Sequence, residues 1–272
     1  MNGGSSFARP PAFHSLVHWI LAASAVLRLR QSPDGRLLAR RLLDRPGTIV
    51  IVGRRPPAFL ARWRVREAYD VTNPSGLCRG ESRLPDGVSL VLLDLERWRY
   101  TPRAAQRHPV RATRCVSRRL RREGIGLLVA PGTDLLRGTR WRRLGGRIAV
   151  RYLRSGLAPR LSLFASAYEI QSQGLEYHPL LYRRTVAALV RQIHAARPGL
   201  PVYAGLSTNP HGPRVRLGLL ERDIRMTRGF VAGYWLNVPA PGGHCPRCRP
   251  PRTGLALALL DVETPLSGRE GK

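Results

Sequence analysis

Short β-rich runs alternate with helical stretches from residue 48 onward, and this alternation limits the folds open to the chain. Strands that are buried on both faces must be almost wholly apolar. The runs that meet this condition are residues 48–52, 88–94, 125–130, the latter part of 161–173, 202–206 and 231–236, with a weaker candidate at 65–71. Strict alternation of strands and helices implies a parallel sheet with helical crossovers.

The parallel sheet can be an open doubly wound sheet or a closed barrel. No Gly-x-Gly-x-x-Gly or P-loop pattern follows any of the runs, which disfavours a nucleotide-binding open sheet. Polar residues instead recur at the ends of the runs, as they do at a barrel mouth. We therefore predict an α/β fold, a TIM-type (β/α) barrel over residues 46–262, with a separate segment at 1–45 and a polar tail at 263–272. No eighth strand is evident, which leaves open a barrel that is incomplete at its N-terminal side.

The formal net charge of +29 raises the question of a polyanionic partner. Of the 46 basic residues only Lys272 is a lysine, and the arginines are spread through every segment. Nucleic-acid binders more often concentrate charge on one helix or tail. The pattern therefore disfavours a dedicated nucleic-acid function and leaves binding to an anionic surface open.

The apolar run at residues 15–27 allows two interpretations. It is shorter than the roughly 20 residues of a membrane span, but it matches the core of a signal peptide, and Ala23-Ser24-Ala25 has the small-x-small cleavage pattern. The alternative is an amphipathic helix that packs against the barrel. Export or membrane association is the first expectation, and a cytoplasmic protein is the alternative.

Candidate site residues follow the predicted strands at their C-terminal ends, which converge on one cleft in a TIM barrel. The set combines carboxylates, amides, hydroxyl groups and aromatic rings, which is what a carbohydrate site needs. We expect catalytic roles for Asp94, Glu96 and Glu169, and substrate contacts from Trp98, Gln171, Gln173, Ser207, Asn209, Tyr234, Trp235 and Asn237.

Asp94 and Glu96 have the most specific spacing in this set. Residues two apart on a strand project to the same face, and a neighbouring negative charge raises a carboxyl pKa, which helps one acid to remain a proton donor near neutral pH. The structural alternative is an ion pair of Glu96 with Arg97 or Arg99. Glu169 has the same alternative, with Arg183 or Arg184 as its partner.

Residues 91–96 resemble the end of the Asp-x-x-Asp-x-Asp-x-Glu motif of chitinase-type, family 18-like TIM-barrel glycoside hydrolases. In that family the motif ends the fourth barrel strand, and its glutamate is the acid. Four predicted strands follow Glu96, and Trp235 lies on the last. The resemblance implies Glu96 as the proton donor with Asp94 as its partner. The aspartate of the motif that precedes Asp94 is replaced here by Leu92, and the family's Met-x-Tyr-Asp signature is replaced by residues 169–173.

The pair Cys245 and Cys248 has the Cys-x-x-Cys spacing. In an exported protein such a pair fits a local disulfide that pins the loop, and free thiols or half of a zinc site are the alternatives. No second pair completes a zinc site, because Cys78 and Cys115 are far apart in the sequence. We expect no metal.

The sequence thus predicts a monomeric, carbohydrate-active or carbohydrate-binding barrel without a cofactor. If the protein is an enzyme, it is a glycoside hydrolase that acts on an oligo- or polysaccharide, with Glu96 as general acid. The alternatives are an inactive barrel that serves as a binding or structural module, and an arginine-rich binder of nucleic acid or anionic surfaces.

Overall fold

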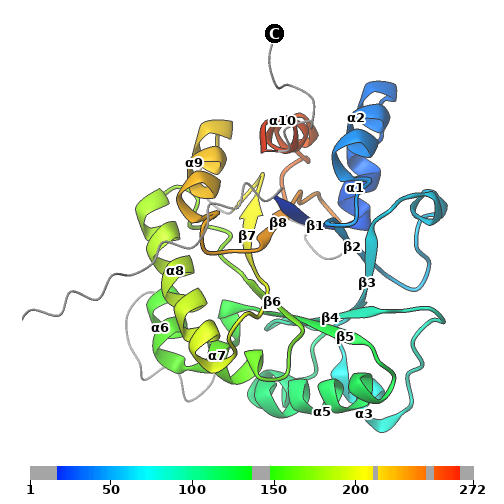
Figure 1. Ribbon diagram of the computed structural model, residues 1–272, viewed down its shortest axis with the longest axis vertical. Coiled ribbons are helices and arrows are strands. Elements are labelled where there is room, and N and C mark those ends of the chain that lie inside the picture. The colour runs from blue at the N-terminus through cyan, green and yellow to red at the C-terminus, as the bar shows by residue number, and fades with distance from the viewer. Residues whose placement is uncertain (1–16, 137–147, 211–213, 243–247, 264–272) are drawn as a thin grey trace, which may run out of the picture.

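The computed structural model describes residues 17–136, 148–210, 214–242 and 248–263. Eight parallel strands form a closed barrel in chain order, and β1 pairs with both β2 and β8 (Figure 1). The strands are β1 (His18–Ala22), β2 (Ile49–Val52), β3 (Arg66–Val71), β4 (Leu90–Leu95), β5 (Gly126–Pro131), β6 (Ala167–Ile170), β7 (Val202–Ser207) and β8 (Gly233–Asn237). The predicted TIM-barrel fold is confirmed.

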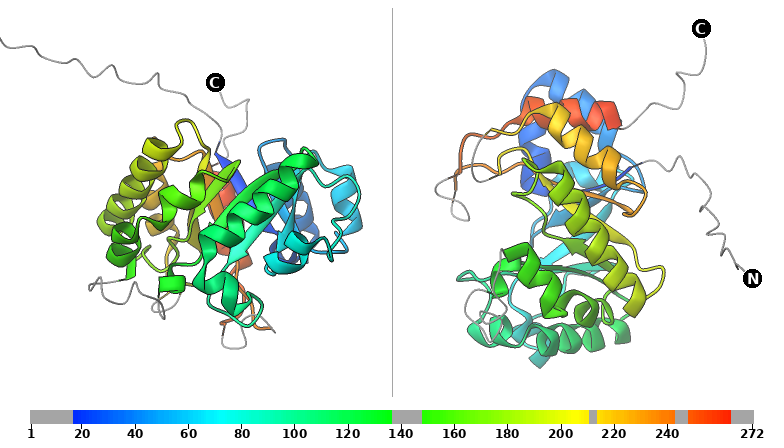
Figure 2. Two further views of the ribbon diagram at one scale, coloured as in Figure 1. Left: turned by 90° about the horizontal axis from the view of Figure 1, so that it is seen from below. Right: turned by 90° about the vertical axis from the view of Figure 1, so that its left-hand side faces the viewer.

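Helices cover the outside of the barrel, as both views of Figure 2 show. They are α1 (Ala23–Leu29), α2 (Pro33–Leu43), α3 (Pro74–Arg79), α4 (Arg103–Arg107), α5 (Pro109–Arg122), α6 (Ile148–Ser155), α7 (Leu157–Ser162), α8 (Pro179–Ala196), α9 (Leu217–Thr227) and α10 (Thr253–Glu263), with 3-10 turns η1 (Ala58–Arg62) and η2 (Thr133–Leu136). Prolines at the first position begin α5 and α8, where their missing N–H costs nothing.

The barrel is complete, and β1 is the strand that the sequence did not reveal. It comes from the apolar run predicted at residues 15–27, of which residues 18–27 belong to β1 and α1 with no residue between the two elements. Trp19 is fully buried on the helix side of β1, and its ring lies 6.0 Å from that of Tyr234. The proposed helical alternative for this run is therefore only half right, because its first part is a strand of the barrel.

The barrel interior is filled by apolar side chains. Because successive residues of a strand point to opposite faces, every second residue points toward the axis. The buried interior residues are Ile20, Ile49, Ile51, Ala68, Leu90, Leu92, Leu128, Ala130, Ala167 and Tyr203. Polar side chains lie one step further along several of these strands, toward the C-terminal mouth.

A disulfide joins Cys78 on α3 to Cys115 on α5, with the two Cα atoms 5.8 Å apart. The two residues are 37 positions apart in the sequence, and no local pattern predicted the pairing. Cys248 is also disulfide-bonded, whereas Cys245, its predicted partner, lies outside the described residues.

Of the helices in the described part of the chain, none combines the length and the apolar character that a bilayer span requires.

Candidate active site at the barrel mouth

Three acids point toward the barrel axis at its C-terminal end. Asp70 on β3, Asp94 on β4 and Glu169 on β6 each lie two residues beyond an interior apolar residue, so alternation places all three on the inner face. One oxygen of each carboxyl group is buried and has no hydrogen-bond partner: Oδ1 of Asp70, Oδ1 of Asp94 and Oε2 of Glu169. Buried polar atoms without partners are rare in folded proteins and often mark functional positions.

Glu96 follows β4 directly and is partly exposed. Its Oε1 accepts a hydrogen bond of 2.8 Å from Nε2 of Gln171. Its backbone N–H donates to Oγ1 of Thr101, which also accepts from the indole N–H of Trp98 at 2.8 Å. The glutamate is therefore held from β6 and from its own loop, while part of it stays open to solvent.

Glu169 lies deeper and is fully buried. Nε2 of Gln173 lies 3.5 Å from its Oε1. The carboxamide of Gln173 lies against Gly205 on β7, where a Cβ atom would collide with it. Glycine at 205 thus creates the space that lets Gln173 reach Glu169.

The acids of the cluster are buried and lie near one another, and both factors raise their pKa values. Burial raises the pKa of Asp94 well above its ordinary value, and the charges of Glu96, Asp70 and Glu169 raise it further. Burial also raises the pKa of Glu96, opposed by the hydrogen bond from Gln171, and it raises the pKa of Asp70 to about 6. The pKa of Glu169 is raised well above normal by burial and by Glu96.

No ion pair with an arginine neutralises these acids within the described residues. The guanidinium of Arg99 donates to the hydroxyl of Tyr100, and that of Arg183 lies over the ring of Phe230, 5.9 Å from its centre. The ion-pair alternatives for Glu96 and Glu169 are thus not found in this part of the chain.

Two acids of the cluster were missed by the sequence analysis. Asp70 is the next-to-last residue of the weak strand β3, and Asp134 lies in η2, which follows β5 after Gly132. Oδ1 of Asp134 accepts from the backbone N–H of Arg97 at 3.1 Å. A Cβ atom on Gly132 would lie 2.6 Å from this oxygen and 3.1 Å from Cγ of Glu96, so Gly132 allows both acids to approach the chain. The rule of polar residues at strand ends would have found both acids.

The two tryptophans take different positions. Trp235 points into the barrel from β8, packs against the interior residues and is partly exposed. Trp98 is partly exposed in the loop after β4, and its ring meets that of Tyr100 edge-on, with centroids 5.1 Å apart. Both rings keep some surface that a sugar face could cover.

Tyr234 is not at the mouth, contrary to the sequence prediction. It is adjacent to the inward-pointing Trp235 and therefore points outward, where it is 1% exposed. Its hydroxyl donates to the backbone oxygen of Ile224 at 3.0 Å and lies 2.8 Å from Oγ1 of Thr227. Tyr234 joins the barrel to α9 and cannot line a substrate site.

Three further predicted residues lie at the mouth with varied accessibility. Asn237 ends β8 and is exposed. Ser207 ends β7 and is buried, and its Oγ accepts from the backbone N–H of Asn209 at 3.2 Å. Nδ2 of Asn209 donates to the backbone oxygen of Pro250, so this side chain ties two loops together. Of the three, only Asn237 is freely available to a ligand.

The described residues contain no group of three or more His, Cys, Asp or Glu side chains arranged to hold a metal ion.

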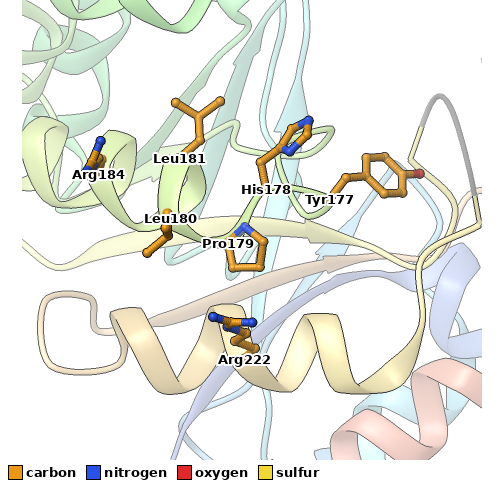
Figure 3. A pocket seen from close by; sticks show the side chains of 7 residues that line it. All are labelled: Tyr177, His178, Pro179, Leu180, Leu181, Arg184 and Arg222. Carbon is orange, nitrogen blue, oxygen red and sulfur yellow. The ribbon is translucent and has the colours of Figure 1, made fainter.

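A cavity of about 520 Å³ lies away from the barrel axis, between α8 and α9 (Figure 3). Its lining combines apolar side chains with His178 and two exposed arginines, Arg184 and Arg222. A second cavity, of about 680 Å³, lies beside β2 and β3, where its lining includes Val52, Glu67 and Tyr69. Neither contains an acid of the mouth cluster.

No family model matches the sequence, and no curated protein matches it in a sequence search. Solved structures similar to this chain include triosephosphate isomerase from Bartonella henselae, with a TM-score of 0.48 and 12% identity over 82% of this chain and 92% of that one. A "putative alpha-L-fucosidase" from Bacteroides thetaiotaomicron has a TM-score of 0.48 and 8% identity, covering 87% and 90%. The PgaB (BpsB) glycoside hydrolase domain from Bordetella bronchiseptica has a TM-score of 0.34 and 12% identity, covering 82% and 94%. Likenesses this distant carry no information about the activity of this chain.

Proposed function

We propose that this protein is a glycoside hydrolase in which Glu96 is the general acid. The observation that carries the proposal is a cluster of acids at the barrel mouth with no arginine partner in the described part of the chain. Burial and like charges raise the pKa of Glu96, so that this carboxyl can still hold a proton at a pH where an ordinary glutamate has lost it. A proton donor of this kind is what general acid catalysis requires.

The proposed reaction needs one proton donor and one ionised carboxylate. Glu96 gives its proton to the glycosidic oxygen as the bond from that oxygen to the anomeric carbon breaks. Asp70, whose pKa is about 6, is ionised at neutral pH and serves as the second carboxylate. It either takes a proton from the attacking water or attacks the anomeric carbon itself, in which case water later releases the sugar.

We assign supporting roles to the deeper acids. Glu169 is fully buried, so it cannot touch a sugar unless the mouth rearranges. Asp94 lies beside Glu96 on the same face, and its negative charge would raise the pKa of Glu96 and help that acid to hold its proton. Gln171 orients the Glu96 carboxyl through its 2.8 Å hydrogen bond, and Trp98, Trp235 and Asn237 provide sugar contacts.

The test compares Glu96→Gln with wild type on a panel of oligosaccharides and on aryl glycosides with good leaving groups. We expect Glu96→Gln to lower kcat on natural linkages about 10²- to 10⁴-fold, because general acid catalysis contributes this much. The loss should be much smaller on aryl glycosides, whose leaving group needs no proton. Asp70→Asn should reduce turnover of both substrate types equally. Glu123→Gln, which removes an exposed acid paired with Arg119, is the matched control.

One observation favours a second function, a binding module without catalysis. The amides of Gln171 and Gln173 already contact Glu96 and Glu169, so two of the acids have internal partners. A binding module predicts thermal stabilisation by an oligosaccharide without turnover. Stabilisation that survives in Glu96→Gln, with no product from wild type, would replace the hydrolase proposal.

A further inference from the structure

A second pair of acids lies outside the mouth cluster, between the β6–α8 loop and α9. Glu176 belongs to this loop and Asp223 to α9, and both side chains are fully buried. Their neighbours in the sequence, Tyr177 and Arg222, line the cavity in Figure 3. Neither acid forms an ion pair with an arginine within the described residues.

The carboxylate of Glu176 connects two backbone segments. Its Oε2 accepts from the N–H of Gly174 at 2.5 Å, and its Oε1 accepts from the N–H of Ser207 at 2.8 Å. One side chain therefore closes the β6–α8 loop on itself and fastens it to the end of β7. Hydrogen bonds from N–H groups to an ionised carboxylate are about twice as strong as neutral ones.

The loop that Glu176 fastens carries the amides of the mouth. Gln171 and Gln173 begin the loop and contact Glu96 and Glu169. Oγ of Ser172 donates to the backbone oxygen of Gly205 at 2.8 Å, which adds a second connection to β7. A shift of this loop would therefore move both amides relative to the acids that they contact.

Asp223 lies close enough to Glu176 to affect its ionisation. Both oxygens of Asp223 are buried without a hydrogen-bond partner, and burial followed by the charge of Glu176 raises its pKa to about 8. Burial raises the pKa of Glu176 to about 7, against the opposing effect of its backbone hydrogen bonds. Among the neighbouring titratable and charged groups, Arg222 lowers the pKa of Asp223. The two acids in turn raise the pKa values of Tyr177, Tyr182 and Tyr234.

We propose that Glu176 is a positioning residue, which holds the β6–α8 loop on β7 and thereby sets Gln171 and Gln173 against the acids of the mouth. Asp223 lies near Glu176, and in its protonated form it places no second negative charge beside that carboxylate. The effect on catalysis rests on the proposed hydrolase function, whereas the effect on the loop does not.

Hydrogen exchange tests the loop directly. In Glu176→Gln the amide group presents an N–H₂ to one of the two backbone donors, so one hydrogen bond is lost. We expect the protection of the Gly174 and Ser207 amides to fall about tenfold or more, with β4 and β5 unchanged. In wild type the same amides should lose protection, after correction for intrinsic rates, as the pH falls through the pKa of Glu176 near 7.

Asp223→Asn is the matched control, because it removes the neighbouring acid and leaves both hydrogen bonds of Glu176 in place. Its loop amides should keep their protection on the alkaline side, and the acid-induced loss should stay near pH 7, because wild-type Asp223 is already protonated where Glu176 titrates. Equal protection in wild type and Glu176→Gln, or exchange that ignores the pH between 6 and 8, would overturn the proposal.

Activity gives the second readout once a substrate is identified. Glu176→Gln should lower kcat more than it raises KM, and it should remove the fall in kcat near pH 7 while leaving the fall near pH 6 that the protonation of Asp70 causes. Asp223→Asn should keep both. A loosened loop with unchanged kcat would contradict the positioning role alone. An inactive wild-type protein whose loop responds as expected would contradict the hydrolase function and leave the loop mechanism standing.

Discussion

Replacing Asp223 by asparagine should stabilise the protein at alkaline pH. The wild-type acid is fully buried, and neither of its oxygens has a hydrogen-bond partner in the described structure. Its pKa rises from 3.8 to about 8 on folding. The folded protein therefore binds this proton more tightly than the unfolded chain, and stability falls as the pH rises between these two values.

The magnitude follows from the size of the change in pKa. Each tenfold change in proton affinity corresponds to about 1.4 kcal/mol, so the full rise sets an upper limit of about 6 kcal/mol at pH 9. Local relaxation and water entry lower this figure, and we expect about 2–3 kcal/mol in practice. At or below about pH 4 the acid is protonated in the unfolded chain as well as in the folded protein and is nearly isosteric with asparagine, so the two proteins should have similar stability there, and the difference should grow as the pH rises to about 8.

The assay is chemical or thermal unfolding of both proteins at several pH values. Since 1 kcal/mol shifts the Tm of a protein of this size by roughly 2–4 °C, Asp223→Asn should melt about 5–10 °C above wild type at pH 9 and within a few degrees of it at about pH 4. Asp86→Asn, at an exposed position, should show no such difference. A difference between Asp223→Asn and wild type that stays constant with pH would refute the reasoning.

Three further predictions concern the scaffold. A variant that lacks residues 1–22 should fail to fold, as judged by circular dichroism, because the loss of β1 exposes the edges of β2 and β8. Replacing Cys78 and Cys115 by serine should lower the free energy of unfolding by about 4 kcal/mol, from the loop of 37 residues that the disulfide closes, and a denaturant titration measures it. Gly205→Ala should cost about 1–3 kcal/mol in the same titration, because the added Cβ collides with Gln173. An unaltered midpoint in either titration would contradict the corresponding contact.

The sequence predicted seven of the eight strands, and the physical reason for the exception is clear. The strands β2 and β4 to β8 are apolar runs bounded by turns, whereas β1 continues directly into α1. An apolar run without a break has no period that separates a strand from a helix. The strand β3 was visible only weakly, because Arg66, Glu67 and Asp70 interrupt its apolar pattern.

The alternation of side chains along a strand predicts which candidate residues face the barrel axis. The sequence prediction used it for Asp94 and Glu96 but not for Tyr234 and Trp235. Asp94, Glu96, Glu169, Gln171 and Gln173 do lie together at the mouth. Tyr234 and Trp235 are consecutive residues of one strand, so they could not both face the axis.

Sequence patterns do not predict contacts between segments that are distant in the chain. The disulfide between Cys78 and Cys115 and the approach of Glu176 to Asp223 depend on how loops and helices pack, which no local spacing encodes.

The chain carries a large excess of positive charge, so acids at the mouth that lack an arginine partner are more informative than they would be in a neutral protein. With 46 basic residues, acids outside the barrel readily find arginines, as Asp44, Glu81 and Asp261 do. Asp70, Asp94 and Glu169 have no arginine partner among the described residues despite this excess. Leaving a buried acid unpaired raises its pKa and costs stability, which a structural role would not require. Such a cost is typical of a functional site, and this is why we propose that the chemistry takes place at the mouth.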